Sequence, residues 1–192
     1  MERKKIGFLA VVLISLCFRS NSQNNEIIRP GLIRVMGTIS PSKMLGMNDS
    51  YFYLHGNFEA YLNKKVSFCG DAYYFLGAQS GKSTLEMNHN IFYGLLLHFT
   101  KNTNDLYMGI QPGVAITKLN PEENGISNSS AGTNPVFSAI AGYNFYVNPY
   151  FNFFIQSRFI LGEHNYDLHK DISELRLSAG LGFNLNVLKQ KK

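Results

Sequence analysis

Tryptophan is absent from this sequence of 192 residues, and cysteine is rare, with only two residues. One of the two, Cys17, lies in an N-terminal segment that we expect to be removed, so only Cys69 remains and no disulfide can form within the mature chain. Charged residues make up 16% of the sequence, whereas about 25% is usual for soluble domains. The hydrophobic fraction of 45% excludes an intrinsically disordered chain.

Long apolar runs are also missing after residue 22, because none reaches the length of about 18 residues that a transmembrane helix requires. A helical membrane protein is therefore excluded. The formal net charge of +5 falls to +2 without residues 1–22, which hold four cations and one anion, and no basic stripe is visible. We therefore expect no nucleic-acid partner. Phosphate-binding glycine loops, CxxC pairs and long repeats are missing too.

The first 22 residues have the features of a secretory signal peptide. A basic stretch at residues 3–5 precedes an apolar stretch at residues 6–18, and cleavage is expected after Ser22. A lipoprotein acylated at Cys17 is the less favoured alternative, because Leu16 is larger than the residue that such sites prefer. The sequence therefore predicts export from the cytoplasm.

Past this leader, apolar and polar residues alternate with a period of two, which is typical of half-buried β-strands. In the last block, apolar residues occupy every odd position from 175 to 187, and polar residues or glycines alternate with them. The eight predicted strands are residues 31–39, 51–62, 65–77, 89–100, 105–118, 135–147, 150–161 and 174–188.

The connections between these blocks alternate between short and long. Short turns lie at residues 63–64, 101–104 and 148–149, and long polar segments lie at 40–50, 78–88, 119–134 and 162–173. This alternation is typical of outer-membrane barrels, which have short periplasmic turns and long extracellular loops. A sheet in lipid must close, because hydrocarbon offers no partner to free backbone groups.

We therefore expect an all-β fold, an eight-stranded antiparallel up-and-down transmembrane β-barrel preceded by a cleaved signal peptide. The expected segments are a signal peptide at 1–22, a short periplasmic segment at 23–30, the outer-membrane barrel at 31–188 and a basic tail at 189–192. The even number of strands places both termini in the periplasm.

Alternation alone does not say which face points outward. A soluble barrel of lipocalin type would turn its apolar face inward around a ligand. An apolar outer face is favoured by the wholly apolar face of the last block, and by the charges and glycines on the opposite face. The glycines are Gly109, Gly113, Gly142, Gly180 and Gly182.

Aromatic residues near the block ends are expected to form belts at the two membrane interfaces. They are Tyr51, Phe52, Phe99, Tyr107, Phe145, Tyr146, Tyr150 and Phe151.

Polar residues then face the lumen, which in an eight-stranded barrel is just wide enough for side chains. We expect these residues to form a structural polar plug and not a conducting pore. The predicted plug consists of Arg34, Glu59, Asp71, Gln111, Gln156, Arg158, Glu174 and Arg176, and His55 and Asn144 are expected to face inward as well. Buried ions require partners. The candidate pairs are Glu59 with Arg34 or Arg158, and Asp71 with Arg176.

Four stretches resemble a known family: Gly37–Leu45, His55–Leu62, Val66–Asp71 and Gly109–Gly113. The sequence resembles the small outer-membrane β-barrel family of Bacteroidota, which is related in architecture to OmpA/OmpX-type porin-family barrels, over about residues 27–188. The resemblance implies the barrel fold and an outer-membrane location in a Gram-negative envelope. Such barrels commonly end in an aromatic residue that the assembly machinery reads, whereas residues 188–192 contain none. Assembly through a variant signal or a partner is therefore expected.

Catalytic and metal sites have weak support. Lipid A-modifying barrels need a Ser/His/acid set, and His164 and His169 with Asp167 and Asp171 contain competent metal ligands. The candidate catalytic sets are Ser83, Glu86 and His89, and Glu163, His164 and Ser173. Polar loops produce such sets by chance, so we predict no catalytic residue, no cofactor and no metal.

The preferred function is that of a non-catalytic outer-membrane barrel with a structural or accessory role in the envelope or in a larger outer-membrane complex. A barrel that binds or transports a small solute or lipid is the alternative, and a lipid A-modifying enzyme comes third. The expected partners are outer-membrane lipid and lipopolysaccharide and, for an accessory subunit, other outer-membrane proteins.

Overall fold

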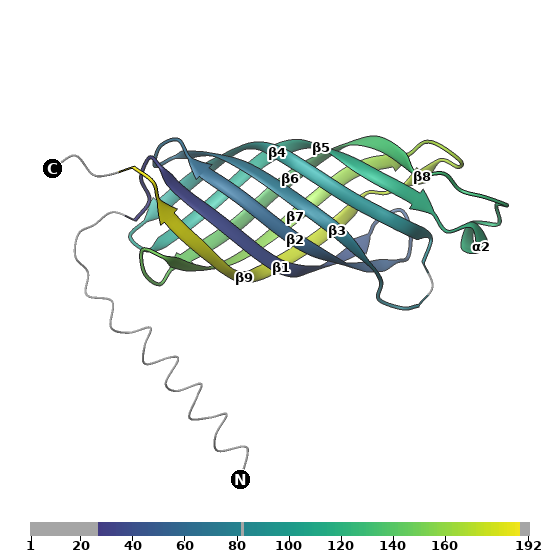
Figure 1. Ribbon diagram of the computed structural model, residues 1–192, viewed down its shortest axis with the longest axis horizontal. Helices are drawn as coiled ribbons and strands as arrows, with labels where there is room; N and C mark the ends of the chain where they lie inside the picture. The colour runs from purple at the N-terminus through teal and green to yellow at the C-terminus, as the bar shows by residue number, and fades with distance from the viewer. Residues whose placement is uncertain (1–26, 82, 189–192) are drawn as a thin grey trace, which may run out of the picture.

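The computed structural model describes residues 27–81 and 83–188, which form a β-barrel of tilted strands with long loops at one end (Figure 1). The strands are β1 (Leu32–Met44), β2 (Ser50–Tyr61), β3 (Val66–Ala78), β4 (Leu85–Lys101), β5 (Asn104–Leu119), β6 (Gly132–Tyr146), β7 (Phe151–His164), β8 (Lys170–Asp171) and β9 (Glu174–Asn186). The predicted signal peptide, residues 23–26 of the segment 23–30 and the tail at 189–192 lie outside the described residues.

Eight long antiparallel strands surround the lumen. Each pairs with its neighbours in the order β1 to β7 and then β9, and β1 pairs with β9 to close the barrel. The two-residue strand β8 only extends the loop-side end of β7. The predicted eight-stranded antiparallel barrel is confirmed, and closure leaves no long strand with a free edge.

Alternation sorts the side chains between the two faces, because successive residues of a strand point to opposite sides. In β6, every second residue is buried, and the residues between them are exposed. Large apolar side chains such as Phe137, Phe153 and Ile155 cover the outer face. The apolar face points outward, as predicted.

Glycines on the inner face make room for larger lumen side chains. A Cβ atom at Gly113 would collide with Phe92, and one at Gly142 would collide with Tyr107. The predicted inward position of these glycines therefore has a packing reason.

Asparagine shapes the three short turns, since its side chain can bond to nearby backbone and it tolerates positive φ. The Oδ1 atoms of Asn63 and Asn148 each accept hydrogen bonds from the N–H groups two and three residues further on. Asn102 adopts a φ of 56°.

Two strand boundaries differ from the prediction by four or more residues. β1 continues to Met44 instead of ending at residue 39, and β4 begins at Leu85 instead of residue 89. Pro41 lies at the end of a stretch of β1 that is not paired with β9, so its missing N–H removes no bond from that ladder. A proline that suggests a loop in the sequence is therefore tolerated within the strand.

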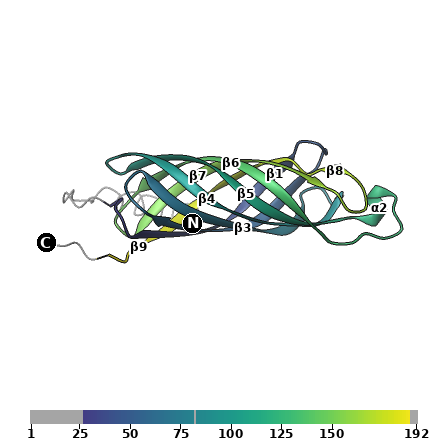
Figure 2. The same ribbon diagram turned by 90° about the horizontal axis from the view of Figure 1, so that it is seen from above.

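The loops gather beyond one end of the barrel. The short helix α2 (Pro121–Asn124) lies in the β5–β6 loop, and this loop and the segment around β8 extend past the same end (Figure 2). Within residues 27–81 and 83–188, no helix has the length and apolar character needed to cross a membrane.

Candidate functional site

All eight residues of the predicted polar plug lie in the barrel interior and are at most 2% exposed. The structure therefore brings them into one lumen, but they form separate clusters at different heights. The buried charged side chains of the described residues are Arg34, Arg158, Arg176, Glu59, Asp71, Asp105 and Glu174.

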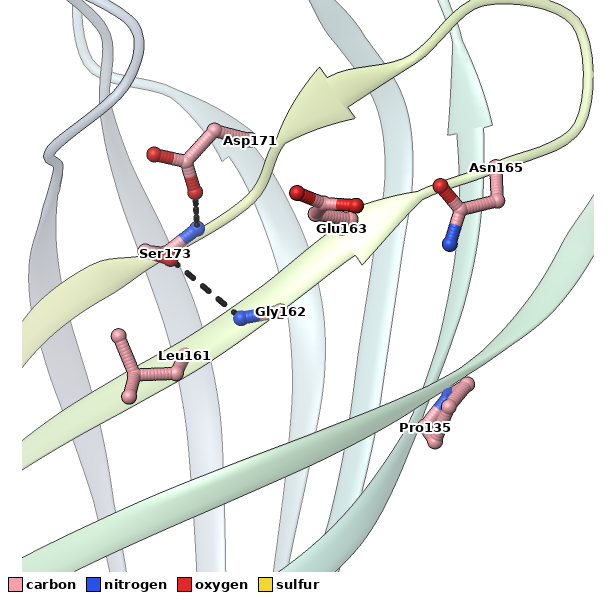
Figure 3. A pocket seen from close by; sticks show the side chains of 7 residues that line it. All are labelled: Pro135, Leu161, Gly162, Glu163, Asn165, Asp171 and Ser173. Carbon is pink, nitrogen blue, oxygen red and sulfur yellow. Dashed lines mark hydrogen bonds between the residues drawn. The ribbon is translucent and has the colours of Figure 1, made fainter.

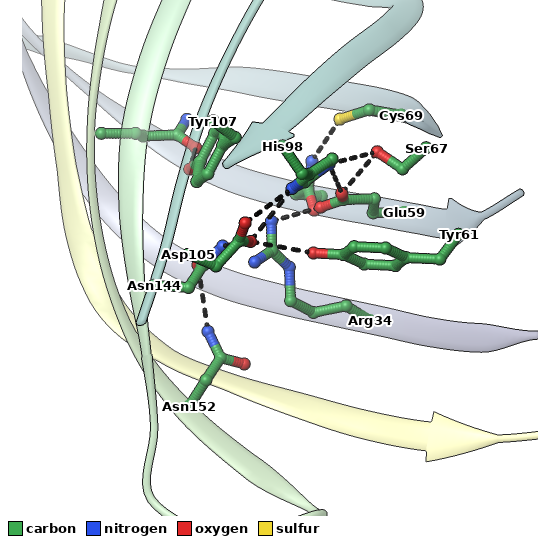
Figure 4. Close-up of polar contacts among 12 residues, drawn as sticks. Arg34, Glu59, Tyr61, Ser67, Cys69, His98, Asp105, Tyr107, Asn144 and Asn152 are labelled. Carbon is green, nitrogen blue, oxygen red and sulfur yellow. Dashed lines mark hydrogen bonds and ion pairs between the residues drawn. The ribbon is translucent and has the colours of Figure 1, made fainter. Parts of the chain in front are cut away.

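The first cluster, whose contacts are drawn in Figure 4, is formed by residues near the short-turn ends of β1, β2, β4 and β5. The Arg34 guanidinium forms an ion pair with Glu59, its direct neighbour across the β1–β2 ladder. His98 lies between two carboxylates, with Nε2 at 3.0 Å from Glu59 and Nδ1 at 3.0 Å from Asp105. Because both ring nitrogens face carboxylate oxygens, His98 donates to both of them only when it is doubly protonated. When His98 is doubly protonated, its charge and those of the three buried arginines equal in number the charges of the four buried carboxylates.

The middle of the lumen is organised by Arg158. Its Nη2 lies 2.6 Å from Asp71, and its Nη1 donates to Gln111 at 2.6 Å and to Ser138 at 2.7 Å. The Asp71 carboxylate also bonds to His55 Nε2 at 2.8 Å. It also accepts hydrogen bonds from Asn57 Nδ2 at 3.0 Å and from Cys69 Sγ at 3.2 Å, so each of its oxygens has two partners inside the protein.

Arg176 forms the third cluster, toward the loops. It pairs with Glu174, which also accepts hydrogen bonds from the Asn88 amide at 3.2 Å and the Tyr53 hydroxyl at 3.4 Å. The predicted pairing of Asp71 with Arg176 is therefore wrong, and the predicted pair of Glu59 with Arg34 is present. Arg158 and Arg176 face each other across the β7–β9 ladder. Like charges this close each need a separate carboxylate.

Apolar side chains fill the two ends of the lumen. The loop-side cluster consists of Met44, Tyr51, Tyr53, Tyr73, Leu85, Phe92, Ala115, Leu119, Val136, Ile160 and Ile172. Ile28, Leu32, Tyr61 and Tyr146 pack together at the short-turn end. The charged clusters therefore lie between two apolar layers.

The four long loops are joined into a ring by hydrogen bonds. The bonds run from Thr84 N–H to Asp49 Oδ2 at 2.9 Å, from Asn124 Nδ2 to Thr84 O at 2.8 Å, from Ser129 Oγ to Asp167 Oδ2 at 2.8 Å and from Leu45 N–H to Ser173 O at 2.8 Å. This ring ties the four loops together at one end of the barrel.

Two carboxylates hold this ring. Hydrogen bonds from the Ser129 hydroxyl and the Ser130 N–H lower the pKa of Asp167. Partial burial raises the pKa of Asp49, but hydrogen bonds from the Tyr51 hydroxyl and from Thr84 outweigh it and hold the pKa below its ordinary value. Both carboxylates are therefore charged at neutral pH and act as acceptors.

A Ser–His–Asp chain occurs in the turn-side cluster, at positions that sequence reasoning did not select. Ser67 Oγ lies 2.8 Å from His98 Nε2, and His98 Nδ1 lies 3.0 Å from Asp105. This is the order of a catalytic triad. The Ser67 hydroxyl, however, is completely buried and donates to Glu59 at 2.5 Å. These three side chains therefore form a structural hydrogen-bond network. Only the register between the strands, which the sequence does not give, could have predicted that they meet.

The two candidate catalytic sets from the sequence are not assembled. Glu163 and His164 are adjacent on β7, so their side chains point to opposite faces. His164 is buried, with Nδ1 2.6 Å from the Thr117 hydroxyl. In the other set, Ser83, Glu86 and His89 bond instead to Leu85 O, Lys118 and the Phe75 N–H.

The candidate metal ligands of the β7–β9 segment also have other partners. Asp167 bonds to the β5–β6 loop, and His169 bonds to Asn165 at 2.9 Å. Among the described residues, no three His, Cys, Asp or Glu side chains are grouped closely enough to hold a metal ion.

A shallow hollow lies on the outer surface near the loop end (Figure 3). Its polar groups bond to one another: Ser173 Oγ accepts from Gly162 N–H at 3.3 Å, and Asp171 accepts from Ser173 N–H at 2.8 Å. The lining residues are Pro135, Leu161, Gly162, Glu163, Asn165, Asp171 and Ser173.

The predicted aromatic belts are only partly present. Tyr51, Tyr107 and Tyr146 are buried in the lumen, because they occupy inward positions of their strands. Phe99 and Tyr150 are exposed on the short-turn side, at 57% and 60%. The direction of each aromatic ring therefore follows from its inward or outward position in the period-two pattern of its strand, and not from its distance to the strand end.

Solved outer-membrane proteins have similar folds. OprG from Pseudomonas aeruginosa matches with a TM-score of 0.62 and 13% identity over 83% of this chain and 98% of that protein. Neisserial surface protein A gives a TM-score of 0.59 and 16% identity over 80% and 96% of the two chains. Ail of Yersinia pestis, in complex with the heparin analogue sucrose octasulfate, gives 0.55 and 12% over 81% and 99%. No protein-family model matches the sequence, and neither does any curated protein. The likeness is one of fold.

Proposed function

We propose that this chain is a non-catalytic integral outer-membrane barrel of OmpA/OmpX type, with a structural or accessory role in the envelope or in a larger outer-membrane complex. The observation that carries the proposal is the filled interior, in which ion pairs are enclosed between two apolar layers under a ring of loops. Such an interior suits a scaffold better than a channel. The sequence resemblance favours an origin in Bacteroidota.

The outer face supports the membrane location. Exposed leucine, isoleucine and phenylalanine side chains occur on all eight long strands, many of them about half exposed. Water-exposed apolar patches of this extent are rare on soluble monomers, whereas lipid covers them without cost. In this placement, the short turns, the start of β1 and the end of β9 face the periplasm, and lipid and lipopolysaccharide are the surrounding partners.

Conductance in planar bilayers tests the filled interior. We expect the reconstituted barrel to give no steady current, while a general porin in the same bilayers gives stepwise openings. Reproducible single-channel steps from the purified barrel would contradict the plug.

Gentle extraction of the tagged protein from outer membranes tests the accessory role. Stoichiometric partners in the eluted particle, identified by mass spectrometry, would support an accessory subunit. A lone heat-modifiable barrel would favour a free-standing envelope protein. The lipid A acyl pattern of a deletion strain should be unchanged, and a lost or added acyl chain would instead indicate an enzyme.

A further inference from the structure

The seam between β1 and β9 is interrupted in the middle of the barrel. The ladder pairs Met36 with Gly182 and resumes, in the same register, with Ser42 opposite Arg176. Between these points, residues 37–41 and 177–181, all of them described by the structure, have no backbone pairing with each other. The same stretch of β1 pairs with β2 without a break. The wall is therefore continuous on one side of β1 and interrupted on the other.

Side-chain hydroxyl groups bridge this interruption. Thr38 Oγ1 donates to Ala179 O at 2.7 Å, and Ser40 Oγ donates to Leu177 O at 2.7 Å. Thr38 occupies an inward position of β1 but is only half-buried, unlike its inward neighbours Met36 and Ser40. The seam thus leaves one inward-facing side chain partly accessible.

Little covers the seam on its outer side. Gly37 and Gly56 face each other across the β1–β2 ladder, and a Cβ atom on either of them would meet nothing within 4 Å. Ile39, Leu177 and Leu181 flank the interruption and are 59%, 52% and 55% exposed. The outer side is an apolar surface with a gap in its side-chain cover.

The inner side of the seam presents unused polar groups. The Arg176 guanidinium reaches from β9 past β1 to the rings of Tyr53 and Tyr73, at 3.8 and 4.4 Å. Its Nε and Nη1 atoms are buried without a partner, as are Ser42 Oγ, directly opposite in the ladder, and Glu174 Oε2. Two donors, one hydroxyl and one carboxylate oxygen are therefore free beside the interruption. Buried groups of this kind normally have partners.

We propose that the β1–β9 seam is a lateral binding site for a single-chain amphiphile with an uncharged, hydroxyl-bearing head group, such as a monoacylglycerol. The acyl chain lies on the outer surface beside Ile39 and Leu177. The head group displaces the Thr38 and Ser40 hydroxyls from the opposite strand and thereby reaches Arg176, Glu174 and Ser42. The head group is uncharged because Glu174 already balances the Arg176 charge, and a hydroxyl both donates to the carboxylate and accepts from the guanidinium. This inference rests on the membrane location proposed above.

Photo-crosslinking in phosphatidylcholine vesicles tests the site, with a monoacylglycerol that carries a diazirine in its chain. We expect labelling concentrated on peptides from β1 and β9. The pair Ser40→Cys and Ser178→Cys locks the seam, because their Oγ atoms lie 2.8 Å apart. The oxidised lock should abolish the preferential labelling, and reduction should restore it. Met108→Cys with Ala141→Cys, a facing pair on β5 and β6, is the matched control and should have no effect.

Ser42→Ala tests the head-group contact, since Ser42 Oγ has no hydrogen-bond partner within the described protein and its loss should leave folding intact. We expect about fivefold weaker labelling of the seam, the factor for one lost hydrogen bond. Hexadecane should compete poorly, and unlabelled monoacylglycerol should compete well.

Labelling spread evenly around the barrel, or unchanged by the lock, would overturn the site while leaving the membrane location intact. Equal competition by hexadecane would overturn the head-group contact. A barrel that takes no label on any strand would instead contradict the membrane location itself.

Discussion

At the scale of single residues, Arg158 joins four side chains of the interior, which are Asp71, Gln111, Ser138 and Tyr73. Arg158→Ala leaves the Asp71 carboxylate buried without its ion-pair partner. Breaking a buried pair in this way costs about 3–5 kcal/mol. We expect a loss of this size in the free energy of unfolding, measured by guanidinium titration of the refolded barrel in detergent.

Replacing both partners at once distinguishes the cost of an unpaired buried charge from the cost of losing the arginine side chain. Arg158→Met with Asp71→Asn should lose less stability than Arg158→Ala alone, because no unpaired charge remains. The exposed pair of Lys118 and Glu86 is the control, and Lys118→Ala should change stability by no more than about 1 kcal/mol. If Arg158→Ala were as mild as Lys118→Ala, the pair would not hold the interior together.

Two glycines of the same barrel should respond oppositely to alanine. A Cβ at Gly113, inside the lumen, collides with the ring of Phe92 and the carbonyl of Ile91, whereas one at Gly56 meets open space on the outer face. We expect Gly113→Ala to cost about 1–3 kcal/mol through overpacking, and Gly56→Ala to stay within about 0.5 kcal/mol. Equal unfolding midpoints for the two variants would contradict the inward position of Gly113.

Residue identities predicted which side chains face the lumen, but not which of them meet. Alternation is a property of each strand alone, so it placed Arg34, Asp71 and Arg158 inside. Their pairing depends on the register between strands, and a one-residue shift moves every side chain to the other face. The pair of Asp71 with Arg158 joins residues that are 87 positions apart, and nothing in the sequence fixes that distance.

At the scale of elements, the strands were predictable because lipid and lumen impose a strict period of two. The loops were not, since their hydrogen bonds join segments from four different connections. The end of β1 was predicted too early because Pro41 suggests a loop. Proline has no backbone N–H to donate, but Pro41 lies in the stretch of β1 that is not paired with β9, so no ladder bond to β9 is lost.

The loop ring predicts a response to acid. The hydrogen bonds to Asp167 lower its pKa, so its contribution is present above the ordinary aspartate value of 3.8 and is lost as the pH falls through the lowered value. We expect amide-exchange protection of Ser130 to be constant from neutral pH to mild acid and to fall only below that range, after correction for the intrinsic exchange rate. Asp167→Ala should remove this protection at neutral pH, and Glu122→Ala, on the exposed face of α2, should not. Protection that survives Asp167→Ala would contradict the clamp.

At the scale of the whole molecule, the membrane location depends on which face of the wall meets lipid. The sequence contains no tryptophan, so a single introduced tryptophan is a unique fluorescent reporter. Ile155 and Phe154 are neighbours on β7, but Ile155 is 57% exposed on the outer face, and Phe154 is 4% exposed in the lumen. In vesicles with brominated acyl chains, we expect strong quenching of Ile155→Trp and weak quenching of Phe154→Trp.

The two variants share height, strand and chemistry, so only the direction of the side chain differs between them. An apolar outer face in contact with hydrocarbon requires unequal quenching, because bromine quenches only at short range. A soluble barrel would show no dependence on bromination at either position. Stronger quenching at residue 154 than at 155 would mean that the strand is turned with its lumen side toward the lipid, and it would invalidate the ion-paired interior together with the lateral site.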